Sequence, residues 1–415
     1  MFIRDLYLNL TMNEKDNSSF HFPFYLTKMF FTILLVSFTV IGSLTLNTNY
    51  IAISQQQQQL STNESNNNQI SYYAKQQPPF LEDLSFDIDN VTFSHHMASV
   101  NGIQLHYVIG GQGDPLVLLH GFPQSWYEWR HIMPALAKNY TVVVPDLRGF
   151  GDSSKPVTGY DGNTTAEDIY QLVSQLGFNQ PILLVAHDVG AQTAYSYAFA
   201  HPNNVSKLVI MDFPYPGFLP PEFGVNGPWW FAFHQTPNLP EFLVEGKERV
   251  YLSYFIKGLA YNPSAITEED IDIFANHFSS PGTARSAFEY FRAFPVDAEQ
   301  NIESSKTKIT IPVLALGGDI YPALGGDVPG NFAASSLQSL ATNVTGVIVP
   351  LSGHWIPEER PDFALDQLSK FFGGNKNNKS QKNIILYLYQ HGNVGSNIDS
   401  GSKSGVYCRY TTIYY

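Results

Sequence analysis

The residues with the clearest capacity for chemistry stand at positions 183–191, which read Leu-Leu-Val-Ala-His-Asp-Val-Gly-Ala. A short apolar run ends there in a small residue, a carboxylate and a second small residue, and a helical pattern follows over 192–198. This layout is typical of a sharp strand-to-helix turn that lifts Asp188 above a sheet, with Ala186 and Gly190 leaving room for the turn. A carboxylate there can attack carbon and form an ester that water cleaves. The segment therefore predicts hydrolysis at an electrophilic sp³ carbon, such as an epoxide or a carbon–halogen bond.

Partners for Asp188 follow other apolar runs of the chain. Residues 120–123 read His-Gly-Phe-Pro, and the backbone N–H of Phe122, with that of Val189, would form an oxyanion hole. His354 follows the last apolar run, which is the place expected of a base that activates water. An aspartate that only caps a helix would look like Asp188 locally, but these partners favour a catalytic role.

Two aspartates compete for the role of the acid that orients His354 and stabilises its protonated form. Asp212 follows the apolar run at 208–211, and Asp319 follows the run at 312–316. Both positions are strand ends, where a carboxylate could reach the histidine. The pattern of the chain alone leaves both candidates open.

Apolar runs alternate with helical patterns between residues 92 and 373, which predicts a mostly parallel sheet flanked by helices. Two further runs predict an antiparallel hairpin around Asn101-Gly102. A long helical insertion separates the fourth parallel run from the fifth. Ligands bind beyond the carboxyl ends of such strands, so the candidate residues should meet at one edge. The parallel runs are 116–119, 141–144, 182–185, 208–211, 312–316 and 347–349.

Four motifs together resemble the α/β-hydrolase superfamily, in the branch of epoxide hydrolases and haloalkane dehalogenases. The motifs occupy 120–129, 146–153, 187–190 and 353–355. The resemblance implies an α/β-hydrolase fold, with a mostly parallel central sheet in a core at 92–216 and 304–373. It also implies that 217–303 form a helical cap domain above the nucleophile.

The resemblance assigns roles to the candidate residues. It implies Asp188 as the nucleophile and His354 as the base. The segment 211–216, Met-Asp-Phe-Pro-Tyr-Pro, is similar to members that use the earlier acid, so we favour Asp212 over Asp319. No cofactor or metal is needed for this chemistry.

The cap should decide which leaving group the site serves. Trp230 and Phe291 stand where relatives tend to carry His and Tyr, while His234 and Tyr290 remain nearby. Tyr290 is our first candidate to donate a proton to an epoxide oxygen, whereas the indole N–H of Trp230 suits a halide. We expect these four residues and Trp126 to contact the substrate or its leaving group. Epoxide hydrolysis to a diol is the first expectation; haloalkane or haloacid dehalogenation, and binding without catalysis on the same fold, are the alternatives.

Composition narrows the partners of the chain. The formal net charge is −13 with no block of Lys and Arg, which argues against a nucleic-acid partner. The expected partners are the reactants of the predicted chemistry, a small apolar electrophile and water. Cys408 is the single cysteine, so no intramolecular disulfide or cysteine metal cluster can form. His95 and His96 are interpreted as a polar strand end, and Asp146 and Arg148 as an ion pair that holds a loop. Nothing in the sequence indicates the oligomeric state.

The N-terminal region predicts export or anchoring. A polar-aromatic segment, 1–28, precedes an uncharged apolar segment at 29–46, which is typical of a signal peptide or a single membrane anchor. A low-complexity stretch, 47–91, predicts a disordered spacer. We therefore expect a catalytic domain outside the cytoplasm, attached to a membrane if the apolar segment is not cleaved. The tail at 374–415 carries no recognisable chemistry.

Overall fold

The computed structural model describes residues 85–221, 227–320 and 331–373, which all belong to one unit that begins at Leu81. Within this described part of the chain, no helix is long and apolar enough to cross a membrane. Several predicted segments lie outside the described residues, namely 1–28, the apolar segment 29–46, most of the spacer and the tail 374–415. The prediction of disorder is wrong for the described end of the spacer, because Ser85–Ile88 form a strand that pairs with the strand beginning at Val91.

A nine-stranded sheet forms the centre of the described unit, in the order β1-β2-β3-β5-β4-β6-β7-β8-β9. The strands from β5 to β9 in this order pair in parallel, and β1, β2 and β3 add an antiparallel extension at one side. The mostly parallel sheet predicted from the apolar runs is thus confirmed. The strands are β1 (Ser85–Ile88), β2 (Val91–Val100), β3 (Ile103–Gly110), β4 (Asp114–Leu119), β5 (Tyr140–Pro145), β6 (Ile182–His187), β7 (Val205–Met211), β8 (Val313–Gly318) and β9 (Val344–Val349).

The predicted hairpin is also confirmed. Val100 pairs with Ile103 across a two-residue turn, in which Asn101 and Gly102 have φ angles of 43° and 77°. Two consecutive positive φ angles match the twist of the flanking strands, and Asn-Gly adopts them readily. Local turn chemistry therefore sets the register of β2 against β3.

Alternate residues of the central strands point into two separate apolar cores, one on each face of the sheet. In β4, Val117 and Leu119 belong to the core that also contains the cap aromatics, whereas Leu116 and Leu118 belong to the core on the other face. Successive side chains of a strand point to opposite faces, so a continuous apolar run is required where both faces are covered. This explains why the parallel strands read as unbroken apolar segments.

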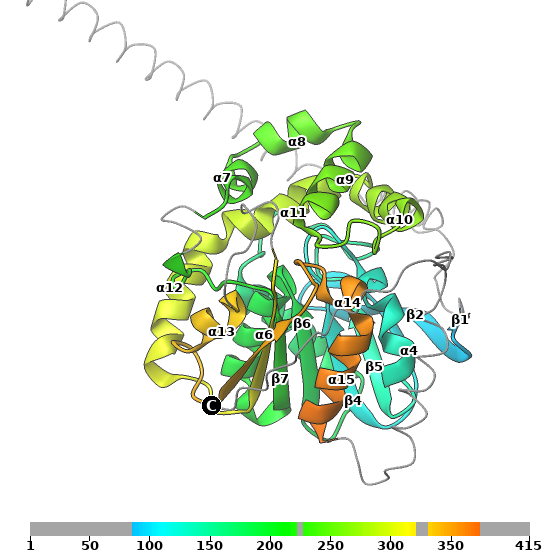
Figure 1. The fold of residues 1–415 in the computed structure, drawn as a ribbon, viewed down its shortest axis with the longest axis vertical. Helices are drawn as coiled ribbons and strands as arrows, with labels where there is room; N and C mark the ends of the chain where they lie inside the picture. The colour runs from blue at the N-terminus through cyan, green and yellow to red at the C-terminus, as the bar shows by residue number, and fades with distance from the viewer. Residues whose placement is uncertain (1–84, 222–226, 321–330, 374–415) are drawn as a thin grey trace, which may run out of the picture. The chain divides into compact units, whose positions relative to one another are not determined.

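Helices cover both faces of the sheet, and a group of helices lies over one edge of it (Figure 1). Helices α7 to α12 stand in the chain between β7 and β8 and form the cap. Of these, α7 to α11 lie over the edge of the sheet, and α12 runs down beside the core (Figure 1). The cap helices are α7 (Trp229–Gln235), α8 (Leu239–Val244), α9 (Glu248–Leu259), α10 (Glu268–Phe278), α11 (Thr283–Arg292) and α12 (Phe294–Ser304). The core helices include η2 (Trp126–His131), α4 (Met133–Leu136), α5 (Gly162–Gln175), α6 (Val189–Ala200), α13 (Phe332–Leu337), α14 (Ile356–Glu359) and α15 (Pro361–Phe372). Of these, η2 is a 3-10 helix, and two shorter 3-10 turns are η3 (Pro202–Asn204) and η5 (Ser305–Thr307).

Candidate active site

Asp188 is the single residue between β6 and α6, and its φ angle is 46°. This is a strained conformation for a residue with a side chain, and such strain persists only where the surroundings impose it. A Cβ atom on Gly190 would lie 2.5 Å from the carbonyl oxygen of His120, and one on Gly121 would lie 2.5 Å from Cβ of Asp188. The strand end at 120–121 therefore packs directly against the turn, and only glycine fits at these two positions.

One backbone N–H group donates to the Asp188 carboxylate, and a second belongs to the next residue of the chain. The N–H of Phe122 donates to Oδ1 of Asp188 at 2.8 Å. Val189 is the first residue of α6, where the helix itself offers no acceptor for the N–H group. One carboxylate oxygen is thus already held at the position where an oxyanion would be stabilised.

His354 lies between two carboxylates. Its Nδ1 is 2.6 Å from Oδ2 of Asp212, and its Nε2 is 3.6 Å from Oδ2 of Asp188. The backbone N–H of His354 donates to the carbonyl of Leu259 at the end of α9, so the cap also holds this loop. The ring can accept a proton on the side of Asp188 while Asp212 holds the other nitrogen.

The two candidate acids occupy different places. Asp212 directly follows β7, has a φ angle of 49° and contacts the imidazole of His354. Asp319 instead accepts hydrogen bonds from the backbone N–H groups of Leu351 and Ser352, at 3.0 and 3.2 Å. It anchors the loop that precedes His354 rather than the imidazole ring.

A cavity opens beside Asp188 and His354, between the strand ends and the cap. Apart from the three candidate catalytic side chains, its described lining is apolar and mostly aromatic. Its described lining residues are Phe122, Asp188, Asp212, Phe213, Pro214, Trp230, Phe231, Phe255, Leu259, Phe291, Phe294, Phe332 and His354.

Two of the five predicted cap and leaving-group contacts line this cavity, and three do not. Trp230 and Phe291 are lining residues. The hydroxyl of Tyr290 donates instead to the carbonyl of Arg148 at 3.0 Å, and burial raises the pKa of this phenol. Tyr290 and Phe291 are neighbours on α11 and so point about 100° apart. Only one of them can face the cavity, and it is the phenylalanine.

The other two expected contacts also differ from the prediction. His234 is fully buried behind the lining, where Nε2 contacts the hydroxyl of Tyr251 and the ring lies 4.3 Å from that of Phe291. Trp126 packs against Phe86, with ring centroids 5.2 Å apart, near the antiparallel strands. The rotation of α7 about its axis decides where His234 points, and the packing of β1 decides where Trp126 lies. Neither can be seen in the sequence around these residues.

The expected ion pair between Asp146 and Arg148 does not form. Nδ1 of His106 lies 2.7 Å from Oδ2 of Asp146, and Nε of Arg148 donates to Oδ2 of Asp168 at 2.6 Å. Side chains two apart in a turn can point in different directions, and each finds a partner from another element. Both residues still stabilise the loop, but through two separate buried pairs.

The interpretation of the adjacent histidines as a strand end is wrong, because His95 and His96 lie inside β2. They point to opposite faces: Nδ1 of His95 lies 2.8 Å from Nε2 of His106, and Nε2 of His96 lies 2.7 Å from Oγ of Ser94. His106, Asp146 and Asp152 form a cluster with potential ligand atoms within 4.8 Å of one another. Both ring nitrogens of His106 already have hydrogen-bond partners, so this cluster is accounted for without a metal ion.

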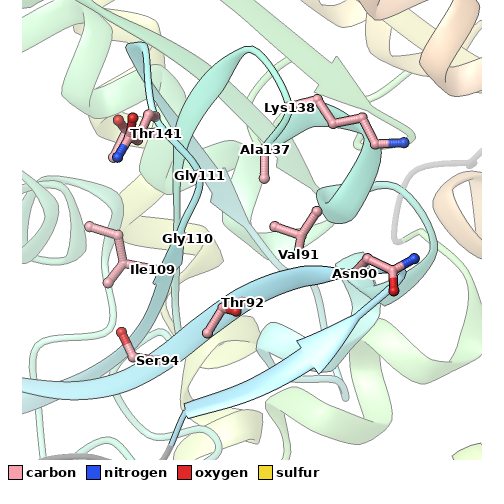
Figure 2. A pocket seen from close by; sticks show the side chains of 11 residues that line it. Asn90, Val91, Thr92, Ser94, Ile109, Gly110, Gly111, Ala137, Lys138 and Thr141 are labelled. Atoms are coloured by element: carbon pink, nitrogen blue, oxygen red, sulfur yellow. The ribbon is translucent and has the colours of Figure 1, made fainter.

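A second hollow lies away from these groups, between the start of β2, the end of β3 and the start of β5 (Figure 2). The start of β5 is the edge of the sheet opposite the carboxyl ends that carry Asp188. Lys138 is the one charged side chain in its described lining, and no predicted site residue lies there. The hollow therefore plays no part in the candidate site.

Two charged residues under the site were not predicted to have a role. Glu128 and His187 are both fully buried, and Oε1 of Glu128 lies 3.1 Å from Nδ1 of His187. The sequence carried one signal for them: each belongs to a motif that also holds a candidate catalytic group.

Comparison with known proteins agrees with this geometry. The family model for the α/β hydrolase fold matches residues 114–361. The soluble epoxide hydrolase of Corynebacterium sp. strain C12 is 40% identical over 289 residues, which is 67% of this chain and 97% of that protein. Epoxide hydrolase 3 of Mus musculus is 30% identical over 276 residues, 63% of this chain and 71% of that protein.

Solved structures are similar to this chain over the same share of its length. The epoxide hydrolase CorEH without ligand has a TM-score of 0.60 and 38% identity, covering 68% of this chain and 99% of that one. Cfl2 from Burkholderia cenocepacia has a TM-score of 0.62 and 37% identity, covering 68% of this chain and 96% of that one. The chain therefore belongs to the α/β-hydrolase family, in the branch that contains epoxide hydrolases.

Proposed function

We propose that this protein hydrolyses epoxides to diols through a covalent ester on Asp188. The observation that carries the proposal is the position of the Asp188 carboxylate between the N–H of Phe122 and the imidazole of His354, which Asp212 holds from its other side. Epoxide hydrolases among the relatives add support. The same arrangement favours an enzyme over a binding protein without catalysis.

In the first step, Oδ2 of Asp188 attacks a carbon of the epoxide ring, and the bond from that carbon to the ring oxygen breaks. The product is an ester with a neighbouring alkoxide, which takes up a proton. Oδ1 stays against the N–H of Phe122 and becomes the carbonyl oxygen of the ester. An apolar lining suits this step, because a poorly solvated carboxylate is a stronger nucleophile.

In the second step, His354 takes a proton from water as the water oxygen attacks the ester carbonyl. The negative charge that develops on the carbonyl oxygen is stabilised by the N–H groups of Phe122 and Val189. The intermediate collapses and the diol oxygen takes the proton back from His354. Asp188 is released as an acid and loses one further proton, which balances the proton taken by the alkoxide.

Dehalogenation is the second candidate, and one observation favours it. Trp230 lines the cavity, whereas Tyr290 does not. An indole N–H can hydrogen-bond a leaving anion but does not give up its proton. A halide needs only that hydrogen bond, while an alkoxide in this cavity would have to take its proton from water.

The test uses His354→Gln, which keeps the nucleophile and removes the base. Incubation with a small epoxide should give a stoichiometric adduct equal to the mass of the epoxide, mapped to the peptide that contains Asp188. The matched control, Asp188→Ala, should give none. Parallel incubation of the wild type with haloalkanes, with measurement of free halide, separates the two candidates. Full diol formation by a folded Asp188→Ala variant would refute both.

We also propose that residues 29–46 export the protein or anchor it, so that the catalytic domain works outside the cytoplasm. The support is the uncharged apolar composition of this segment after Lys28. Expression in the native host with fractionation and N-terminal sequencing tests this. A mature chain that keeps residues 29–46 and stays in the cytosolic fraction would refute it.

A further inference from the structure

Glu128 and His187 connect the two loops that flank Asp188, although neither takes part in the proposed chemistry. Oε2 of Glu128 accepts a hydrogen bond from the N–H of Gly121 at 2.8 Å, and Oε1 lies 3.1 Å from Nδ1 of His187. Nε2 of His187 lies 2.9 Å from the carbonyl oxygen of His354. A continuous buried link therefore runs from the oxyanion-hole loop to the loop of the base.

The partners of His187 define its charge. One ring nitrogen faces a carboxylate and the other faces a carbonyl, and both of these groups only accept hydrogen bonds. The nitrogen that faces the carbonyl of His354 therefore carries a proton, whereas the nitrogen that faces Glu128 lies at ion-pair distance without hydrogen-bond alignment. Burial alone would lower the pKa of His187, but the adjoining carboxylate of Glu128, helped by Asp188 and Asp212, raises it to about 9. His187 is thus an imidazolium at neutral pH, and it donates to the backbone of His354.

The link holds the N–H of Phe122 and the backbone of His354, and ester cleavage depends on these two groups more than ester formation does. Holding the N–H of Gly121 fixes the next peptide, whose N–H on Phe122 donates to Asp188. Holding the carbonyl of His354 fixes the backbone of the base, while Asp212 fixes its ring. Attack on the epoxide uses the Asp188 carboxylate, held at Oδ1 by the N–H of Phe122, and does not use the base. Cleavage of the ester needs the N–H of Phe122 and the base together.

We propose that the buried Glu128–His187 ion pair is a positioning unit that aligns the oxyanion hole with His354, and that it acts chiefly on cleavage of the Asp188 ester. This inference rests on the proposed ester mechanism. A misplacement of about 1 Å can cost about 100-fold in rate, so loosening either loop should slow the second step selectively.

The main test is Glu128→Gln in the full chain. The amide oxygen can still accept from Gly121, but a neutral side chain no longer holds His187 as a cation. We expect ester cleavage to slow by about 10- to 100-fold, while ester formation changes by less than about threefold. Rapid quenching followed by intact mass measurement gives both rates, and kcat should fall with little rise in KM. Glu128→Asp keeps the charge and should restore part of the cleavage rate.

A second variant and a matched control complete the design. His187→Gln keeps a donor toward the carbonyl of His354 but removes the charge, and it carries the test if Glu128→Gln does not fold. His106→Gln removes an equally buried imidazole that is paired with Asp146 and contacts neither loop. It should leave both rates within about threefold of the wild type, since changes away from a site act mainly on stability.

The outcomes are distinct. Accumulation of the ester in folded Glu128→Gln or His187→Gln, but not in His106→Gln, supports the inference. Unchanged rates in the two folded variants, or equal slowing of both steps, would overturn it. If neither the wild type nor His354→Gln forms an adduct with any epoxide or haloalkane, the ester mechanism itself fails, and the inference fails with it.

Discussion

Replacing Asp212 with Asn tests whether the acid beside His354 determines which ring nitrogen is the base. Oδ2 of Asp212 lies 2.6 Å from Nδ1, and Nε2 faces Asp188. A carboxylate only accepts hydrogen bonds, so the ring proton stays on Nδ1 and Nε2 is ready to accept a proton. An Asn amide can donate to Nδ1 instead, which moves the ring proton to Nε2 and removes the base that faces the ester.

The size of the effect follows from the geometry and from measured triads. Loss of the orienting acid in a serine triad lowers the rate by about 10⁴-fold, which corresponds to about 5.5 kcal/mol of barrier height. Asp212 is 3% exposed, so water cannot take over its place. Ester formation does not use the base and should stay within about tenfold of the wild type. Asp212→Asn should therefore form the adduct and then hold it.

Asp319→Asn is the control for this prediction. Asp319 accepts from two backbone N–H groups of the loop before His354, and Asn keeps one of the two acceptors. The expected cost is about 1 kcal/mol of stability for one hydrogen bond, with turnover close to that of the wild type. Time courses of adduct mass after mixing with an epoxide, and thermal unfolding, measure both effects. Persistent adduct in Asp319→Asn with normal turnover in Asp212→Asn would refute the reasoning.

Two further predictions concern the cap. Tyr290→Phe should leave the rate of ester formation unchanged but lower stability by about 1–3 kcal/mol, because the buried carbonyl of Arg148 loses its hydrogen-bond donor. Trp230→Phe should slow ester formation by about tenfold or more, since the cavity loses the indole N–H as a donor. Single-turnover mass measurements and chemical unfolding check both variants, and the reverse ranking would contradict them. Burial raises the pKa of Asp297 from 3.8 to about 8 where it accepts from the N–H of Gly162. The folded state then binds the proton more tightly, so stability falls as pH rises across that window. Asp297→Asn should therefore raise Tm more at pH 8 than at pH 5, and a constant difference would contradict this.

Features that depend on neighbouring residues could be predicted from the sequence. The Asn101-Gly102 hairpin follows from backbone preferences of the two turn residues. The strand-to-helix turn at Asp188 follows from small residues on either side, and the structure places glycine where no Cβ would fit. The unbroken apolar runs predict parallel strands because both of their faces must be covered. The predicted roles of Asp188 and His354 themselves await experiment.

Contacts between distant elements could not be predicted in the same way. Asp212 and Asp319 both follow apolar runs, and only the strand order and the path of the loop before His354 bring one of them to the ring. Tyr290 and Phe291 are adjacent, and the docking angle of α11 decides which faces the cavity.

The buried ion pair under the site shows the same limit. Glu128 and His187 are far apart in the chain, and nothing near either one specifies the other. The sequence by itself determined where strands end, where the chain turns sharply and which residue types stand at those points, because these depend on backbone preference and local apolar pattern. Only the tertiary structure decided which of those side chains meet. A hydrogen bond or ion pair requires two polar atoms about 3 Å apart, and the packing of distant elements sets that separation.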